Sequence, residues 1–122
     1  MTMKKKIVIL GSTGSIGKSA LDVIERESEH FEVLGLACKS NVALLNEQIV
    51  KHKPRHVCLY EKSPGETVLF DRKRLLTGME GMKQMMAMDF DIVLNALPGS
   101  IGLTPTIAAL ENKQTVALAN KE

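Results

Sequence analysis

An apolar run, a glycine-rich turn and a helical stripe follow one another within the first 24 residues. Residues 7–10 (IVIL) form a continuous apolar, largely β-branched run, typical of a strand buried on both faces of a parallel sheet. Glycines follow at positions 11, 14 and 17, and apolar residues recur at helical spacing at positions 16, 20, 23 and 24. This order predicts the first strand, turn and helix of an α/β domain.

The same alternation continues along the chain. Further strands are expected at residues 31–37, 56–60, 90–97 and 115–119, and further helices over residues 42–49, 79–86 and 104–112. Thr104 and Pro105 are interpreted as the N-cap and first turn of the last helix. Residues 61–78 indicate little beyond a short strand within 74–77. The pattern predicts a single α/β domain over residues 1–122, a doubly wound parallel sheet (Rossmann-like) whose strand order the sequence leaves open.

Composition narrows the class of protein. The 122 residues include 16 basic and 14 acidic side chains, and a net charge of +2 is too small to indicate a nucleic-acid surface. No apolar run approaches the ~20 residues of a membrane span, and the first ten residues lack the apolar stretch of a secretory signal. Cys38 and Cys58 are too few for a disulfide framework. We expect a cytoplasmic protein that binds neither nucleic acid nor a membrane.

Five of the seven methionines lie within residues 79–88, four of them at helical spacing. They could form a soft-metal site or an adaptable helix face packed in the core, and we favour the core face. His30, His52 and His56 fall near element ends with no catalytic carboxylate or nucleophile pattern beside them, so we expect them at the surface.

The glycines of the first turn have two interpretations. They could simply allow a tight turn. Alternatively, they could bind phosphate, because ligands of this fold class sit beyond the carboxyl ends of the strands, where helix N–H groups and missing Cβ atoms admit a pyrophosphate. The preceding strand and the following helix favour dinucleotide binding. The spacing is G-x-x-G-x-x-G, with Ser12, Thr13 and Ser15 as hydroxyl donors to phosphate oxygens.

The end of the second strand indicates which dinucleotide is bound. An NAD-binding domain usually carries an acidic residue there, which would repel a 2′-phosphate. This chain instead has Lys39, Ser40 and Asn41, all potential donors. Ser40 or Asn41 could also only cap the next helix, with Lys39 solvated, but capping and ligand binding are compatible. We therefore favour NADP over NAD.

Two more polar stretches end strands on the same rim, residues 95–100 and 119–122. They could face the nicotinamide and substrate, or they could simply be where strands leave the sheet.

Several segments together resemble the N-terminal domain of the 1-deoxy-D-xylulose 5-phosphate reductoisomerase family, and the resemblance covers essentially the whole chain. The segments are LGSTGSIG, ALDVI, SNVALL, GMEGM, NALPGSIGLTPTIAAL and ALANKE. The resemblance implies an NADPH-dependent enzyme of non-mevalonate isoprenoid biosynthesis. Such enzymes rearrange a phosphorylated sugar on a divalent metal and then reduce the product with NADPH to 2-C-methyl-D-erythritol 4-phosphate.

The resemblance also implies roles for individual residues. The pyrophosphate contacts fall on Thr13, Gly14, Ser15 and Ile16, and the contacts around the 2′-phosphate fall on Lys39, Ser40 and Asn41. Asn120 and Glu122 match cofactor-side positions, and Lys121 matches a position facing the substrate phosphate. Some members have a glycine and then a basic residue before the asparagine, whereas this chain has lysine and then serine.

The chain ends at Glu122, before the metal-binding carboxylates and most substrate contacts of the family. We therefore expect that this chain alone is not catalytic and has no catalytic or metal-binding residue, and that Mg or Mn binds only in the full-length protein. The full-length protein is expected to be a homodimer, and the fragment a monomer. The alternatives are the NADP domain of a semialdehyde-type dehydrogenase, a non-catalytic nucleotide- or CoA-binding module, and an interaction domain with incidental glycines.

Overall fold

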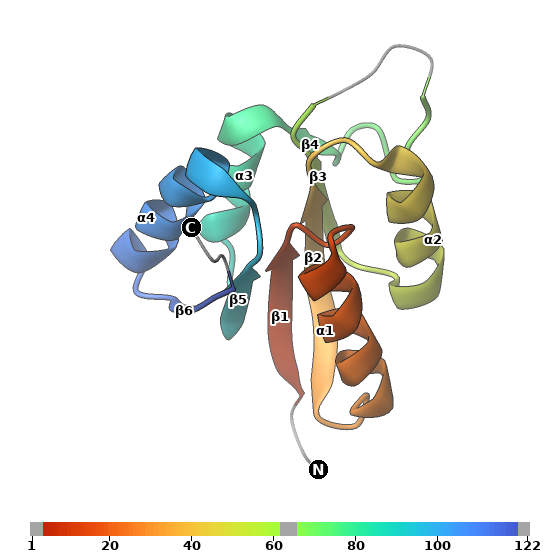
Figure 1. Cartoon of the computed structure of the whole chain (residues 1–122), viewed down its shortest axis with the longest axis horizontal. Coiled ribbons are helices and arrows are strands. Elements are labelled where there is room, and N and C mark those ends of the chain that lie inside the picture. Colours follow the sequence, from red (N-terminus) through yellow and green to blue (C-terminus); the bar gives the residue numbers. More distant parts are fainter. Residues whose placement is uncertain (1–3, 62–65, 120–122) are drawn as a thin grey trace.

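The structure is a computed structural model that describes residues 4–61 and 66–119. Its elements follow the predicted order, including the short strand expected within residues 74–77, with one 3-10 helix added (Figure 1). They are β1 (Lys5–Leu10), α1 (Ser15–Arg26), β2 (Phe31–Cys38), α2 (Val42–His52), β3 (His56–Leu59), β4 (Leu76–Thr77), α3 (Gly78–Met86), β5 (Ile92–Asn95), η1 (Gly99–Gly102), α4 (Leu103–Glu111) and β6 (Thr115–Leu118).

The strands of the described chain form one parallel sheet in the order β4-β3-β2-β1-β5-β6. From β1 the chain builds outward through β2, β3 and β4, and then crosses to the other side of β1 for β5 and β6. The register between β1 and β2 shifts once, where Ile7 pairs with Val33 and Val8 pairs with Gly35. Strand order therefore reverses at β1, which is where ligands of doubly wound sheets bind.

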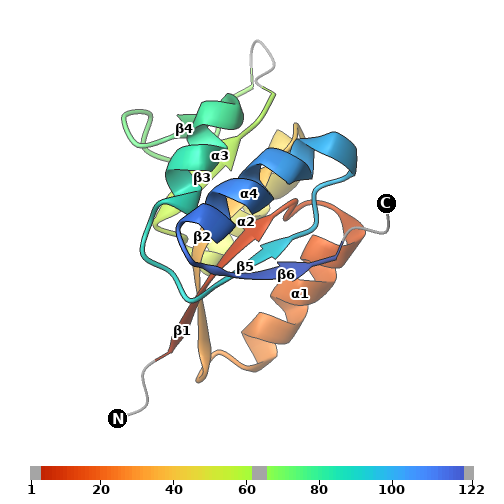
Figure 2. The same cartoon turned by 90° about the vertical axis from the view of Figure 1, so that its left-hand side faces the viewer.

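Helices cover both faces of the sheet, as predicted. Figures 1 and 2 show α1 and α2 on one face and α3 and α4 on the other. Side chains of β1 alternate between the two cores: Ile7 and Ile9 pack with α1 and α2, whereas Val8 and Leu10 pack with α3 and α4. This double burial explains why residues 7–10 are apolar without interruption.

The methionine-rich helix α3 supplies one of these cores. Met82, Met85 and Met86 are completely buried between α3 and the sheet, and Met79 packs at the margin of the same cluster. Flexible thioether side chains fill irregular gaps between a helix and a twisted sheet. The prediction of a core face is confirmed.

The region before α4 differs from its prediction. The 3-10 helix Gly99–Gly102 runs directly into α4, so Gly102 is the N-cap and Thr104 lies inside the helix. The Thr106 hydroxyl donates to the Gly102 carbonyl at 2.8 Å. The prediction that Thr104 caps this helix is wrong, because a helical turn already precedes it.

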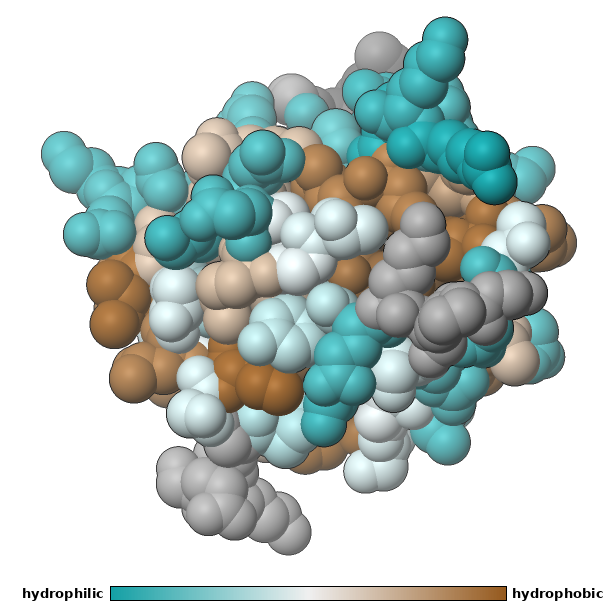
Figure 3. Space-filling model, turned by 90° about the horizontal axis from the view of Figure 1, so that it is seen from above, coloured by the Kyte–Doolittle hydropathy of each residue, from teal (hydrophilic) through white to brown (hydrophobic). Residues whose placement is uncertain are grey.

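Helix α4 is apolar on its outer side as well as its inner side. Leu103, Ile107 and Leu110 are 61%, 48% and 59% exposed. Figure 3 shows apolar side chains exposed on its left, the side on which α4 lies in Figure 1. None of the helices within residues 4–61 and 66–119 is long and apolar enough to cross a membrane.

Candidate dinucleotide site

The turn after β1 is held in place by the ends of two neighbouring strands. The Gly11 and Ser12 amides donate to the Ala37 carbonyl of β2 at 2.7 and 3.0 Å. Gly11 has a φ of +86°, and a Cβ there would lie 2.8 Å from the Ala96 carbonyl oxygen, just after β5. Only glycine combines this backbone conformation with so close an approach. The turn therefore sits at the reversal of strand order.

Gly17 serves packing rather than ligand access. A Cβ at this position would lie 2.2 Å from the Gly11 carbonyl oxygen and 2.8 Å from the Ser12 Cα atom. Helix α1 can therefore lie directly against the turn only if residue 17 has no side chain.

Gly14 is different, because the protein itself leaves room around it. The nearest atom to a Cβ built there is the Gly11 carbonyl oxygen at 3.6 Å, an ordinary contact distance. Gly14 is the N-cap of α1, where no N-cap side chain accepts a hydrogen bond and the first turn holds no acidic residue. The N-terminus of α1 thus offers N–H groups and the positive end of its dipole to an anion.

The residues expected to bind pyrophosphate lie together at this end of α1. Gly14, Ser15 and Ile16 are exposed, and Thr13 is half-buried. Ser12 is different: its residue is completely buried, with its hydroxyl inside the protein. The expectation that the Ser12 hydroxyl reaches a phosphate is therefore wrong, because packing of α1 on the turn encloses it.

Lys39, Ser40 and Asn41 follow β2 and are all exposed. Asn41 caps α2, with its Oδ1 accepting from the Leu44 amide at 3.1 Å, and its side-chain amide group is left for other partners. The Lys39 Nζ atom lies 4.0 Å from Glu61 Oε1, and both side chains are half-exposed. The stretch thus combines a cation with two hydrogen-bonding side chains on the rim next to the turn.

On the other side of the turn, the Asn95 side chain forms hydrogen bonds that hold the segment after β5 in place. Sequence analysis did not identify this role. Its side chain is buried and donates to the Gly102 carbonyl at 2.8 Å and the Thr106 hydroxyl at 2.6 Å. Its Oδ1 accepts from the Leu97 amide at 3.2 Å. These bonds shape the segment 96–102 and use both N–H donors of the amide. The only sequence signal was a polar residue at the end of an apolar strand.

Of the C-terminal stretch 119–122, the structure describes Ala119. The Ala119 amide donates to the Asn95 carbonyl at 3.0 Å, so β6 ends beside β5. Asn120, Lys121 and Glu122 lie outside the described residues.

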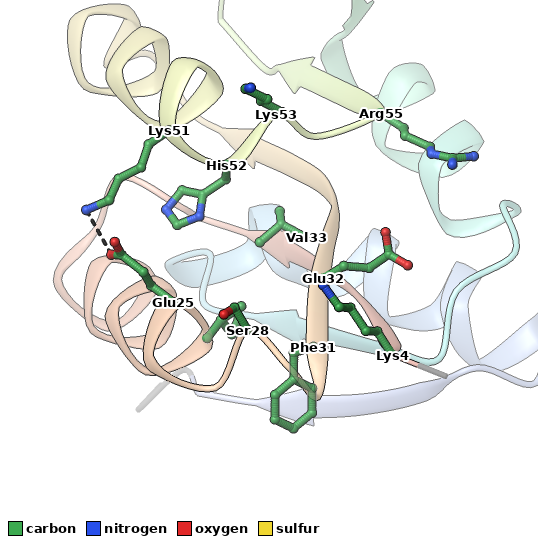
Figure 4. Close-up of a pocket in the computed structure, with 11 residues that line it drawn as sticks. Lys4, Glu25, Ser28, Phe31, Glu32, Val33, Lys51, His52, Lys53 and Arg55 are labelled. Atoms are coloured by element: carbon green, nitrogen blue, oxygen red, sulfur yellow. Dashed lines mark ion pairs between the residues drawn. The ribbon is translucent and has the colours of Figure 1, made fainter. Parts of the chain in front are cut away.

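A separate hollow of about 290 Å³ lies at the opposite end of the sheet, where the amino ends of β1 and β2 meet the ends of α1 and α2 (Figure 4). Its Lys51 is paired with Glu25 at 2.9 Å, and burial lowers the pKa of the half-buried His52. In Figure 4 the charged ends of Lys53 and Arg55 point away from each other. These cations do not converge on one ligand position.

The described residues contain no group of three or more histidine, cysteine, aspartate or glutamate side chains that could hold a metal ion. The part of the chain described here therefore does not fit the divalent metal that the resemblance implies for the full-length protein.

The fold class is the Rossmann type, and the turn after β1 is where such domains hold a dinucleotide. A model of the family described as 1-deoxy-D-xylulose 5-phosphate reductoisomerase matches residues 7–122. The chain belongs to this family, which decides against a semialdehyde dehydrogenase, a CoA-binding module and an interaction domain with incidental glycines.

Relatives and solved structures agree with this assignment. The 1-deoxy-D-xylulose 5-phosphate reductoisomerase of Thermodesulfovibrio yellowstonii is 45% identical over 121 residues, which are 97% of this chain and 32% of the relative. The reductoisomerase structure from Zymomonas mobilis in complex with NADPH has a TM-score of 0.83 at 30% identity, over 98% of this chain and 32% of that one. A reductoisomerase in complex with NADPH, fosmidomycin and magnesium has a TM-score of 0.85 at 29% identity, over 97% and 30% of the two chains. The chain thus spans about a third of the length of these relatives.

Proposed function

We propose that residues 1–122 are the NADPH-binding domain of a 1-deoxy-D-xylulose 5-phosphate reductoisomerase. The observation that carries the proposal is the N-terminus of α1, which has no side-chain cap, no acidic residue, and a glycine at which the protein leaves open space. A pyrophosphate fills such a place well, because it accepts from backbone N–H groups and needs a close approach to the backbone. The solved reductoisomerase structures in complex with NADPH support this cofactor.

Each part of the cofactor has expected partners in this chain. Thr13, Gly14, Ser15 and Ile16 hold the pyrophosphate, and Lys39, Ser40 and Asn41 surround the 2′-phosphate. Asn120 and Glu122 lie toward the rest of the cofactor, and Lys121 faces the phosphate of the substrate. When bound, NADPH supplies the hydride, and these residues fix its position.

The rest of the reaction belongs to the full-length protein. We propose that it rearranges a phosphorylated sugar with a divalent metal, Mg or Mn, and reduces the product to 2-C-methyl-D-erythritol 4-phosphate. Its metal ligands are assigned to residues beyond this chain, so the chain alone is not catalytic. We place the enzyme in the cytoplasm as a homodimer, with the isolated domain a monomer, and expect no nucleic-acid or membrane partner.

Calorimetric titration of the 122-residue chain with NADPH and, separately, NADH tests the cofactor assignment. We expect NADPH to bind at least about tenfold tighter, a difference of ~1.4 kcal/mol, because Lys39 attracts the 2′-phosphate. Lys39→Ala should remove most of this preference, whereas Lys83→Ala, on the opposite face of the sheet, should leave it unchanged.

Gly14→Val tests the phosphate turn in the same assay. The backbone at Gly14 is extended (φ −78°, ψ 172°), so valine fits the fold, but its side chain occupies the place of the pyrophosphate. We expect a native circular-dichroism spectrum and no dinucleotide binding. Unchanged NADPH affinity in this variant would contradict the assignment of the turn.

A further inference from the structure

Gln48 connects α2 to the turn that the proposed function assigns to pyrophosphate. This residue is only 6% exposed, and its Nε2 donates to the Ser12 carbonyl at 2.8 Å across 36 residues of sequence. Because Ser12 O can only accept, the bond also fixes which end of the Gln48 amide faces the turn.

Two polar atoms at this junction lack a hydrogen-bond partner within residues 4–61 and 66–119. Among the described residues, the Gln48 Oε1 and the Ser12 hydroxyl are the buried side-chain oxygens without a hydrogen bond. Burying a polar atom without a partner is unfavourable, and an apolar side chain would avoid that penalty. A glutamine here is thus poorly explained by packing alone, which directs attention to the one bond that it does make.

That bond sets the orientation of the next amide. Of the backbone amides at residues 11–14, three have acceptors: Gly11 and Ser12 donate to Ala37, and Gly14 donates to Gly11 at 3.2 Å. The Thr13 N–H has no acceptor among the described residues. The described chain contains no cis peptide bond, and a trans peptide holds its C=O and N–H on opposite sides. With the Ser12 carbonyl held toward Gln48, the Thr13 N–H must point away from α2.

We propose that Gln48 is a positioning residue for the cofactor: through the Ser12 carbonyl it aims the Thr13 N–H at the pyrophosphate. The inference rests on the proposed function, since it needs a dinucleotide in this turn. Gln48 does not touch the ligand itself. Its bond to Ser12 prepares one donor before the ligand arrives, so that less ordering is needed on binding.

The test is a set of variants of the 122-residue chain, titrated with NADPH by calorimetry and followed by amide NMR. Gln48→Met keeps the length of the side chain and removes both the donor and the unpartnered oxygen. We expect a roughly tenfold weaker NADPH affinity, which is the size of effect that the loss of one hydrogen bond produces. The NADPH-induced shift of the Thr13 amide resonance should shrink, while the thermal midpoint stays near that of the unsubstituted chain. Gln84→Met, an exposed glutamine on α3, is the matched control and should bind normally.

The outcomes separate this inference from the proposed function. Tight NADPH binding by Gln48→Met with an undiminished Thr13 shift would overturn the role of Gln48 and leave the proposed function standing. Failure of the unsubstituted chain to bind NADPH would overturn both. If Gln48→Met does not fold, Gln48→Leu decides with the same two readouts, because its apolar side chain also cannot donate to Ser12.

Discussion

At the scale of single residues, each of the three glycines of the first turn is required for a different physical reason. Gly11 is needed for its backbone conformation and its approach to Ala96, Gly17 for the packing of α1, and Gly14 for the space in front of the helix. The sequence presents them as one repeated pattern. Their separate roles emerge only from the atoms that a Cβ would meet.

This difference predicts that the same substitution destabilises the fold strongly at Gly17 and only slightly at Gly14. Gly17→Ala should destabilise the chain by several kcal/mol, about 3 or more, because its Cβ would overlap a backbone oxygen that cannot move aside. Gly14→Ala should change the free energy of unfolding by less than about 1 kcal/mol, since its Cβ meets nothing closer than 3.6 Å. Urea denaturation of the two variants beside the unsubstituted chain measures both. Equal losses would contradict the packing role of Gly17.

The ion pair between Lys39 and Glu61 predicts that removing the charge of Glu61 strengthens NADPH binding, whereas removing a binding residue weakens it. Glu61 holds part of the Lys39 charge at 4.0 Å and places its own negative charge near the proposed 2′-phosphate position. Glu61→Gln should therefore tighten NADPH binding about two- to fivefold at low salt and leave NADH binding unchanged. Glu80→Gln, whose partner Lys83 lies on the far side of the sheet, is the control. Weaker NADPH binding in Glu61→Gln would refute this interpretation.

At the scale of elements, α3 shows what helical spacing alone can establish. The spacing of the methionines predicted a core face, and the helix buries Met82, Met85 and Met86 completely. Met85→Ala should lower the free energy of unfolding by about 2–5 kcal/mol, because it leaves a cavity against the sheet. Met79→Ala, at the margin of the core, should lower it by only about 1 kcal/mol. Chemical denaturation distinguishes the two, and similar losses would mean that the core is not organised around Met85.

Local pattern predicted elements whose burial follows from their own sequence, such as β1, β2, α1 and α2. It also indicated a short strand within residues 74–77, and β4 is the two-residue strand there, where Leu76 and Thr77 pair with Cys58 and Leu59. It did not predict the 3-10 helix before α4, which is tied to Asn95 by hydrogen bonds. The 3-10 helix depends on hydrogen bonds with one buried side chain, so no hydrophobic period in the sequence indicates it.

The site, too, has residues that the sequence could predict and residues that it could not. The phosphate turn could be found from the sequence because glycine spacing, strand and helix coincide within 20 residues. Gln48 could not be found, because its only relation to the turn is a bond between residues 36 apart in sequence. Likewise, the sequence indicates that the Ser12 hydroxyl can bind phosphate, and only the packing of α1 on the turn shows that it is enclosed.

At the scale of the whole molecule, the two thiols connect the stability of the fold to pH. Cys38 and Cys58 end up in the two cores on opposite faces of the sheet. Burial raises the pKa of Cys38 from 9.0 to about 11 and that of Cys58 from 9.0 to about 12. In the unfolded chain both thiols ionise near pH 9, whereas in the folded chain they remain protonated well above it. The folded state therefore holds more protons than the unfolded state at alkaline pH.

The sign of the pH dependence follows from this difference. Where the unfolded state binds fewer protons, the free energy of unfolding falls as pH rises. The contribution of each thiol is complete below pH 9 and is lost between the unfolded and folded pKa values, at up to about 1.4 kcal/mol per pH unit. Urea denaturation at pH 7, 9 and 10.5 should show the unsubstituted chain losing stability faster than Cys38→Ala/Cys58→Ala. Because the two proteins differ only at the two cysteines, the difference between the two curves isolates the thiols. Parallel curves above pH 9 would mean that the thiols reach water in the folded domain, and that the two cores close less tightly than their packing indicates.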